Sequence, residues 1–543
     1  METVSIVLIL LVAVVVSSAI SRMLPLSLPT PLVQIALGYM IGLASSLRVE
    51  LDPELFLLLF LPPLLFLDGW RIPKDELLKD VSTVFELALG LVLLTVVGVG
   101  FFIHWLIPAM PLAVAFALAA VVSPTDPIAV SAIAARVPIP KRMMHILEGE
   151  SLLNDASGLV CLRFAIAAAL TGSFSIGQAS LSFLWLAIGG IAVGVIVTLS
   201  VTRTKAWISS RFGEDIGSQV LISLLIPFAA YIIAETFHCS GILAAVAAGV
   251  TMTFAEISRQ ALPATRMRRN SVWDTIQFAL NGIIFVLLGE QLPGILTAAR
   301  QTVRITDHAN PWWLAGYILA IMLVLIALRF AWVWISFRLT LFRAREETPY
   351  RRPDWRLMAA MSVAGVRGAI TLAGVLTIPL TLTDGSAFPA RDLAIFLAAG
   401  VIILSLILAS LCLPLLLKGL AMPAEPSEQA QEDAVRVAAA QAAIKAIEKT
   451  QHRLAEGRAD ADVYTATGTR IMDLYRERID SRSQNEKDVR EVARLAGLER
   501  DLRLAGIKAE RDTIFAMARK GRIGSKVAQK LIRDLDLSEV RYR

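Results

Sequence analysis

Thirteen mostly apolar stretches follow one another along the first 420 residues, and they constrain the fold more than any other feature of the sequence. A helix needs about 20 predominantly apolar residues to cross the hydrocarbon core of a bilayer. The stretches lie near residues 4–20, 31–47, 54–70, 83–106, 111–135, 146–170, 181–202, 217–237, 240–256, 273–292, 312–341, 357–382 and 392–418. We therefore predict an all-α polytopic membrane protein with about 13 transmembrane helices.

Charged residues concentrate at the C-terminal end of the chain. Residues 421–543 carry 24 Lys/Arg and 21 Asp/Glu, out of 52 and 46 in the 543 residues. This segment opens with strong helix formers from Ala434 to Ala455, and apolar-periodic pieces follow near 461–478, 488–505, 507–519 and 526–537. We predict two domains, a transmembrane domain at 1–420 and an α-helical cytoplasmic tail at 421–543.

Basic residues occupy alternate loops, and this asymmetry predicts the orientation of the chain. One set of loops holds only Arg48, Arg300, Arg304 and Arg391. The other set holds 20 basic residues: Arg22, Arg71, Lys74, Lys79, Arg136, Lys141, Arg142, Arg203, Lys205, Arg211, Arg259, Arg266, Arg268, Arg269, Arg338, Arg343, Arg345, Arg351, Arg352 and Arg356. The N-terminus is expected outside and the tail in the cytoplasm.

Several classes of function find no support in the sequence. A formal net charge of +6, lying mostly in loops, reflects topology and does not indicate a nucleic-acid partner. The three cysteines, Cys161, Cys239 and Cys412, form no CxxC pair and suggest neither a disulfide framework nor a zinc site. No GxxxxGK[ST] motif is present, so an ATP-driven pump is not indicated. We expect no cofactor and no enzymatic activity.

The fifth span contains Ser123-Pro124-Thr125-Asp126-Pro127. Two prolines around a Thr-Asp pair cannot sustain a regular helix, because each lacks an N–H and clashes with the preceding turn. A lone proline would favour a simple kink. With Asp126 between two prolines, we predict a broken helix whose free backbone groups face a cavity.

The sixth span opens with acidic and hydroxyl residues between Glu148 and Gly158. Ser151 and Asp155 are four residues apart and therefore share one helix face, while Glu150 and Asn154 share the neighbouring face. Oxygen ligands suit hard cations, and a carboxylate can exchange a cation for a proton. An acidic helix start that complements the helix dipole explains Glu148 well, but it explains Asp155 poorly.

The twelfth span contains an arginine, Arg367, between Gly365 and Gly368. Arginine stays protonated at any accessible pH, so it needs a carboxylate partner. The fifth and twelfth spans are seven apart and cross in opposite directions, as an inverted repeat of spans 1–6 on spans 8–13 requires. Two interrupted spans at corresponding positions point to a transport site near the midplane.

Two further charged residues of the spans are candidates with open roles. Asp68 ends the third span beside Trp70, where it either faces the same cavity or anchors the span at the interface, and the sequence favours neither. Arg329 is predicted to be a structural ion-pair member, as are Arg163 and Glu235.

The motifs resemble those of the monovalent cation/proton antiporters of the NhaP type, the electroneutral sodium/proton exchanger branch, in their bacterial form with a helical tail. The matching stretches are FLPPLLFLDG (Phe60 to Gly69), SPTDP (Ser123 to Pro127), GESLLNDASG (Gly149 to Gly158), SGILAAVAAG (Ser240 to Gly249), NGIIFVLLGEQLP (Asn281 to Pro293), VRGAITLA (Val366 to Ala373) and the tail ending KLIRDLDLSEVR. The resemblance implies a multi-pass homodimer in the cell membrane, with two broken helices that cross, which exchanges Na⁺ or Li⁺ for H⁺ in pH and sodium homeostasis.

The resemblance also implies roles for individual residues. Asp155 is the carboxylate that binds cation or proton, with Ser151 and the Thr125 carbonyl as further Na⁺ ligands. Asp126 neutralises helix termini, and Glu150 pairs with Arg367.

Asn154 stands where the electrogenic branch has a second aspartate, which implies 1:1 exchange. The family often places an acid one residue before Asp68, so the assignment of Asp68 as a fourth ligand stays open.

Three alternatives to Na⁺/H⁺ exchange also stay open. A K⁺/H⁺ antiporter would use the same mechanism. A passive cation channel would need a permeation filter, and none is seen. A receptor that signals through the tail would lose its function without residues 421–543.

Overall fold

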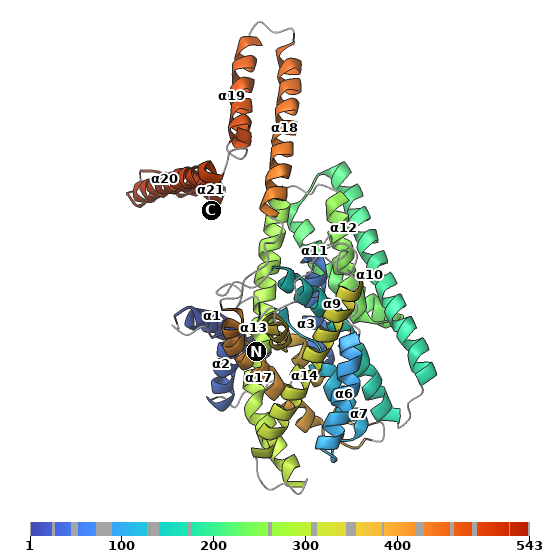
Figure 1. Cartoon of the computed structure of the whole chain (residues 1–543). Coiled ribbons are helices and arrows are strands. Elements are labelled where there is room, and N and C mark those ends of the chain that lie inside the picture. Colours follow the sequence, from blue (N-terminus) through green and yellow to red (C-terminus); the bar gives the residue numbers. More distant parts are fainter. Residues whose placement is uncertain are drawn as a thin grey trace. The chain divides into compact units, whose positions relative to one another are not determined.

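The computed structural model describes residues 2–23, 28–44, 53–71, 90–127, 130, 141–171, 176–258, 263–305, 312–343, 355–382, 385–418, 428–456, 461–480, 486–520 and 522–540. Within these ranges the chain forms eighteen helices (Figure 1), and its only β pairing is an isolated bridge between Thr381 and Ala387. The chain divides into two compact units, Met1–Leu420 and Ala421–Arg543. The fold class predicted from the sequence is confirmed.

Fourteen described helices belong to the first unit. They are α1 (Glu2–Met23), α2 (Thr30–Ala44), α3 (Pro53–Arg71), α6 (Leu91–Leu106), α7 (Leu112–Val122), α9 (Lys141–Thr171), α10 (Ile176–Phe212), α11 (Ile216–Thr236), α12 (Gly241–Ser258), α13 (Pro263–Ile305), α14 (Trp312–Arg343), α15 (Trp355–Val363), α16 (Ala369–Leu376) and α17 (Arg391–Leu417). Each predicted span overlaps one of these helices, except the twelfth, which overlaps both α15 and α16. Parts of the fourth and fifth spans lie outside the described residues.

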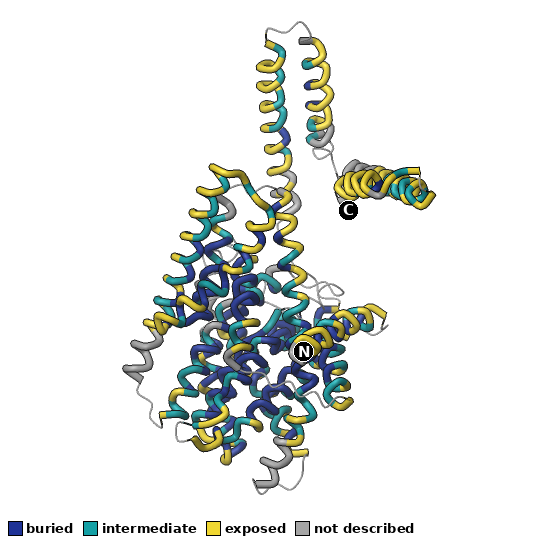
Figure 2. The backbone as a smooth tube through the Cα atoms, turned by 180° about the vertical axis from the view of Figure 1, so that it is seen from behind, coloured by how far each residue is buried: buried dark blue, intermediate teal, exposed yellow. Residues whose placement is uncertain are grey.

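Seven helices of the described chain have the length and apolar composition needed to cross a membrane, and four shorter apolar helices accompany them. Figure 2 shows buried residues concentrated inside the first unit, with exposed residues around them. Many of the exposed side chains are large and apolar, such as Val12, Ile188 and Leu323. A lipid environment accounts for such a surface, since a water-soluble monomer rarely exposes large contiguous apolar patches.

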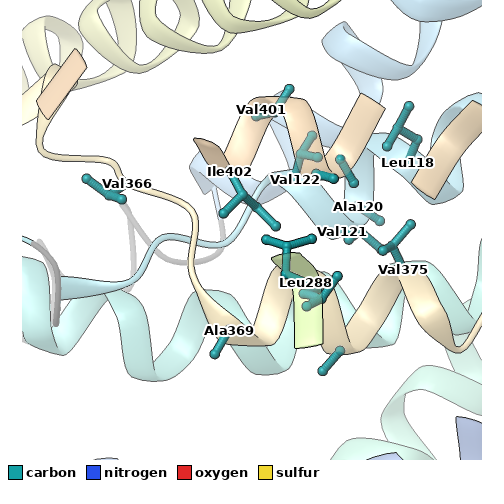
Figure 3. Packing of buried hydrophobic residues seen from close by; sticks show 14 of the residues in the cluster. Leu118, Ala120, Val121, Val122, Leu288, Val366, Ala369, Val375, Val401 and Ile402 are labelled. Carbon is teal, nitrogen blue, oxygen red and sulfur yellow. The ribbon is translucent and has the colours of Figure 1, made fainter. Parts of the chain in front are cut away.

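The centre of the first unit is the packing of α7 against α16 and α17. Val121 and Val122 on α7 lie near Val375 on α16 and near Val401 and Ile402 on α17 (Figure 3). All five side chains are at most 2% exposed. This apolar core surrounds the ends of the interrupted spans. Because it excludes water, the polar backbone groups at those ends must form hydrogen bonds within the protein.

Small residues allow α2 and α13 to approach closely. Gly38 and Gly42 on α2 form a small-xxx-small pair that packs on the backbone of α13 at Val286 and Glu290. In the other direction, Gly289 on α13 packs against the carbonyl of Ile35. A side chain at any of these glycines would meet backbone atoms of the neighbouring helix.

The second unit contains α18 (Glu428–Ala455), α19 (Ala461–Asp480), α20 (Glu486–Arg519) and α21 (Ser525–Val540). Helix α18 packs with α19, and α20 packs with α21, where Arg511 bonds both Asp536 and Glu539. The apolar-periodic pieces at 488–505 and 507–519 belong to one helix, α20, which runs through Gly506. A single glycine costs a helix only about 1 kcal/mol, which the flanking residues offset.

Candidate functional site

The two interrupted spans cross each other at their breaks. Helix α7 ends at Val122 and the chain is non-helical from Ser123 to Asp126, while the second break separates α15 from α16. The backbone N–H of Asp126 donates to the carbonyl of Val366 at 2.7 Å. The extended segment that carries Val366 is visible in Figure 3. Both interruptions expected from the proline and glycine pattern are present, and each supplies hydrogen-bond partners to the other.

Arg367 satisfies backbone carbonyls at the ends of two half-helices. Its guanidinium donates to the carbonyl of Val122 at 2.8 Å and to the carbonyl of Gly365. The last carbonyls of a helix have no partner within it and carry partial negative charge, so a buried cation is favourable there. The backbone N–H of Arg367 donates to Ser405 Oγ at 3.0 Å, which fixes the break against α17.

Asp126 lies at the start of α16. A Cβ on Gly368, the residue that caps α16, would clash with the Asp126 carboxylate. Only glycine therefore allows the acid to approach this closely. The N-terminus of a helix carries partial positive charge, so the carboxylate and the helix end are complementary.

Asp155 is buried in the middle of α9. Its side chain is 4% exposed, and it accepts a hydrogen bond from Ser151, which is 6% exposed. Asp68 and Asp126 lie close enough to interact electrostatically with it. The result is a buried carboxylate with a hydroxyl beside it and two further acids nearby, which is an arrangement suited to a cation or a proton.

Thr125 and Asn154 connect the first break to α9. Asn154 Nδ2 donates to Thr125 Oγ1 at 3.0 Å, and Thr125 Oγ1 lies 3.4 Å from Glu150 Oε1, to which it donates. Both bonds involve the Thr125 hydroxyl, and neither involves its backbone carbonyl, the group that the resemblance implies as a cation ligand. Asn154 Oδ1 is buried and has no hydrogen-bond partner among the described residues.

Glu150 pairs with Arg329 on α14, and the expected pairing with Arg367 is wrong. Two nitrogens of Arg329 donate to the two Glu150 oxygens at 2.5 and 2.7 Å, and Arg329 Nε donates to the carbonyl of Met361 at 3.0 Å. Both side chains are at most 3% exposed. Arg367 takes backbone carbonyls as partners, so it does not require the carboxylate. Arg329 is thus a member of a structural ion pair, as the sequence suggested, and its partner is Glu150.

Asp68 lies near the C-terminal end of α3 and is half-buried. One turn later, Arg71 bonds Asp274 and Gln277 of α13, with a distance of 2.7 Å to Gln277. The Asp68 carboxylate is near enough to feel the charges of both Asp126 and Arg71, so its surroundings include the site and the end of α3. Both interpretations of Asp68 stay open.

Sequence reasoning missed two contributors to the site. Ser405 and the carbonyl of Met361 hold the two arginines in place. A serine within the apolar run Ile402 to Leu408 is a weak signal for the first, whereas nothing in a sequence marks a backbone carbonyl. Arg163 and Glu235, also suspected of ion pairing, bond at 2.7 Å.

The site offers oxygen ligands and lacks the usual ligands of transition metals. Within the described parts of the chain, no group of three or more His, Cys, Asp or Glu could hold a metal ion. Carboxylate, hydroxyl and carbonyl oxygens are the ligands that hard cations prefer.

Comparisons with known proteins agree with this geometry. The family described as "Sodium/hydrogen exchanger, transmembrane" matches residues 7–419. An uncharacterized Na(+)/H(+) exchanger of Escherichia coli, YjcE, is 44% identical over 99% of this chain and 98% of its own. A sodium, potassium, lithium and rubidium/H(+) antiporter of Bacillus subtilis is 38% identical over 100% of this chain and 78% of its own.

A solved structure has the same fold. The sodium proton antiporter MjNhaP1 of Methanocaldococcus jannaschii aligns with a TM-score of 0.55 and 18% identity, over 77% of this chain and 99% of its own.

Proposed function

The chain belongs to the family of transmembrane sodium/hydrogen exchangers and is a multi-pass cation/proton antiporter, and from this premise we propose that it exchanges Na⁺ or Li⁺ for H⁺ in a 1:1 ratio at a site centred on Asp155. The observation that carries the proposal is the burial of Asp155 and its Ser151 partner beside two crossed helix breaks. A buried carboxylate needs a cation or a proton to offset the cost of its desolvation. Since either one meets this need, the two ions compete for the same group.

The proposed Na⁺ ligands are the Asp155 carboxylate, the Ser151 hydroxyl and the Thr125 carbonyl. Asn154 supports the site by holding Thr125, and Asp68 is a fourth ligand to be tested. Asp126 and Arg367 neutralise the ends of the broken helices, while Glu150 and Arg329 neutralise each other.

Charge counting supports the 1:1 ratio. Asn154 occupies the position next to Asp155 and carries no charge, so a single exchangeable charge is assigned to the site. One proton or one monovalent cation neutralises it. Each half-cycle then moves the same charge, and the complete cycle is electroneutral.

Exchange of K⁺ for H⁺ is the second candidate function. The printed name of the Bacillus subtilis relative includes potassium and rubidium as well as sodium and lithium. This favours including K⁺ among the ions to be tested, with the same residues and mechanism.

The remaining proposals concern the whole protein. The distribution of basic residues over alternate loops supports an external N-terminus and a cytoplasmic tail at 421–543. We propose that the protein lies in the inner cell membrane and that this tail is regulatory. We further propose that the protein is a homodimer, acts in pH and sodium homeostasis, requires no cofactor, catalyses no covalent chemistry and binds no nucleic acid.

The test uses purified protein in proteoliposomes with an imposed pH gradient. Adding Na⁺, Li⁺ or K⁺ should release protons from the acidic side, as reported by a pH-sensitive dye. Asp155→Asn should abolish this response, because the amide keeps the size of the side chain but can neither charge nor exchange a proton. Asp392→Asn, at the exposed start of α17, is the matched control and should behave as wild type. Cation-dependent proton release that survives in Asp155→Asn would reject the assignment.

A further inference from the structure

Thr371 on α16 carries a buried hydroxyl that the fold does not satisfy. The residue is 2% exposed, and among the described residues its Oγ1 has no hydrogen-bond partner. Other helical hydroxyls of this unit donate to a carbonyl three or four residues earlier, as do Ser157, Thr251 and Thr377. A buried polar group without a partner is unfavourable, so each such group in a native protein calls for an explanation.

The helix break explains why Thr371 cannot satisfy itself. The carbonyls three and four residues earlier belong to Gly368 and Arg367, and α16 begins only at Ala369. Gly368 is the N-cap and Arg367 precedes it, so Thr371 has no complete helical turn before it, and its hydroxyl bonds neither carbonyl. The same break that creates the crossing leaves the hydroxyl available to a ligand.

Thr371 occupies the side of α16 that approaches the site. Gly368, three residues earlier, packs against the Asp126 carboxylate. Gly374, three residues later, has Leu159 of α9 at 3.1 Å from the position of a Cβ. Residues three apart differ by about 60° around a helix, so Thr371 points between these two directions. Leu159 lies one turn beyond Asp155 on α9, so this side of α16 runs along the helix that carries the carboxylate.

Two other buried oxygens without partners belong to the same junction. Ser123 Oγ, at the end of α7, and Asn154 Oδ1, on α9, have no hydrogen-bond partner within the described chain, and they are 6% and 1% exposed. The two elements are in contact, since Gly158 of α9 packs on Pro124, directly after Ser123. Three adjoining elements therefore each carry a buried oxygen without a partner. This is expected of a binding site for a species that oxygen atoms coordinate.

We propose that the Thr371 hydroxyl is an oxygen ligand of the transported cation, supplied by the second interrupted span. This inference rests on the proposed function and extends its site from α7 and α9 to α16. A neutral hydroxyl suits a monovalent cation because it adds an oxygen without adding a second exchangeable charge. It would also make cation binding depend on the relative position of α16 and α9, because the ligands come from both helices.

The test compares three substitutions in proteoliposomes. Thr371→Val keeps the shape and removes the hydroxyl, and it should raise the apparent KM for Na⁺ about tenfold, the effect of one lost polar contact. Thr371→Ser retains the hydroxyl and should stay near wild type. Thr377→Val is the control at the other end of α16, because the Thr377 hydroxyl is already bonded to the carbonyl of Gly374. It should leave the KM unchanged.

The melting temperature of each purified variant, with and without Na⁺, provides a readout that does not depend on transport. Thr371→Val should lose most of the stabilisation that Na⁺ gives. If its KM and its Na⁺ stabilisation equal those of an active wild type, the inference is overturned while the proposed function stands. A lower melting temperature with an unchanged KM would assign the hydroxyl to a structural water and also overturn it. If Thr371→Val does not fold, Thr371→Ala makes the same prediction. Inactivity of the wild type in the same vesicles would instead reject the proposed function.

Discussion

The pairing of Glu150 with Arg329 is the residue-scale feature on which the geometry of the site depends. Removing one partner of a buried ion pair leaves an uncompensated charge and costs about 3–5 kcal/mol. We expect Glu150→Gln and Arg329→Gln each to lower the unfolding free energy by about that amount, and the double variant to cost clearly less than the sum. A double-mutant cycle of unfolding in denaturing detergent measures the coupling.

An exposed pair is the control for this cycle. Asp473 and Arg476 of the tail bond at 2.9 Å with side chains more than half exposed, and such pairs contribute about 0–1 kcal/mol. Asp473→Asn should therefore have little effect. Additive losses for Glu150 and Arg329 would contradict the pairing, and a larger coupling between Glu150 and Arg367 would restore the interpretation taken from the sequence alone.

The sequence could predict the local arrangement of these residues but not their distant partners. Spacing places Ser151 with Asp155, and Glu150 with Asn154, because helical periodicity is a local property. Arg329 is 179 residues from Glu150, and both Arg329 and Arg367 lie within apolar spans. Arg367 bonds backbone carbonyls at the crossed breaks, whereas Arg329 bonds the Glu150 carboxylate. Only the folded chain shows which arginine reaches which partner.

At the scale of elements, the close approach of α2 and α13 depends on glycine. A Cβ on Gly289 would clash with the carbonyl of Ile35 and lie 2.8 Å from the nitrogen of Tyr39. Both are backbone atoms that cannot turn away, so Gly289→Ala must separate the helices. Overpacking of this kind costs about 1–3 kcal/mol, and we expect a lower melting temperature in detergent.

Gly316→Ala on α14 is the matched control, since nothing lies within 4 Å of its added Cβ. It should leave the melting temperature equal or slightly higher, because alanine is the better helix former. A Gly289→Ala variant as stable as wild type would mean that α2 and α13 do not pack as described.

The elements themselves were largely predictable because apolar length and helix breakers act locally. The proline pair around Asp126 and the glycines around Arg367 predict both interruptions. Their mutual hydrogen bond, from Asp126 to Val366, joins residues far apart in the sequence and required the structure.

At the scale of the whole molecule, the proposed cycle uses one exchangeable charge, that of Asp155, which either a proton or a monovalent cation neutralises. If Asp155 alone changes its charge, a pH gradient of one unit, worth about 1.4 kcal/mol, balances a tenfold cation gradient. Membrane potential is worth about 2.3 kcal/mol per net charge per 100 mV, but it acts only on a cycle that moves net charge. Voltage therefore separates 1:1 exchange from any other ratio.

The most direct measurement is the null point of exchange in proteoliposomes that hold a fixed Na⁺ gradient. The pH gradient at which net proton flux vanishes is determined at several potentials set by potassium and valinomycin. Exchange in a 1:1 ratio predicts a null point that equals the Na⁺ gradient and stays the same at every potential. A null point that moves with voltage would contradict both the 1:1 ratio and the assignment of a single exchangeable charge to Asp155.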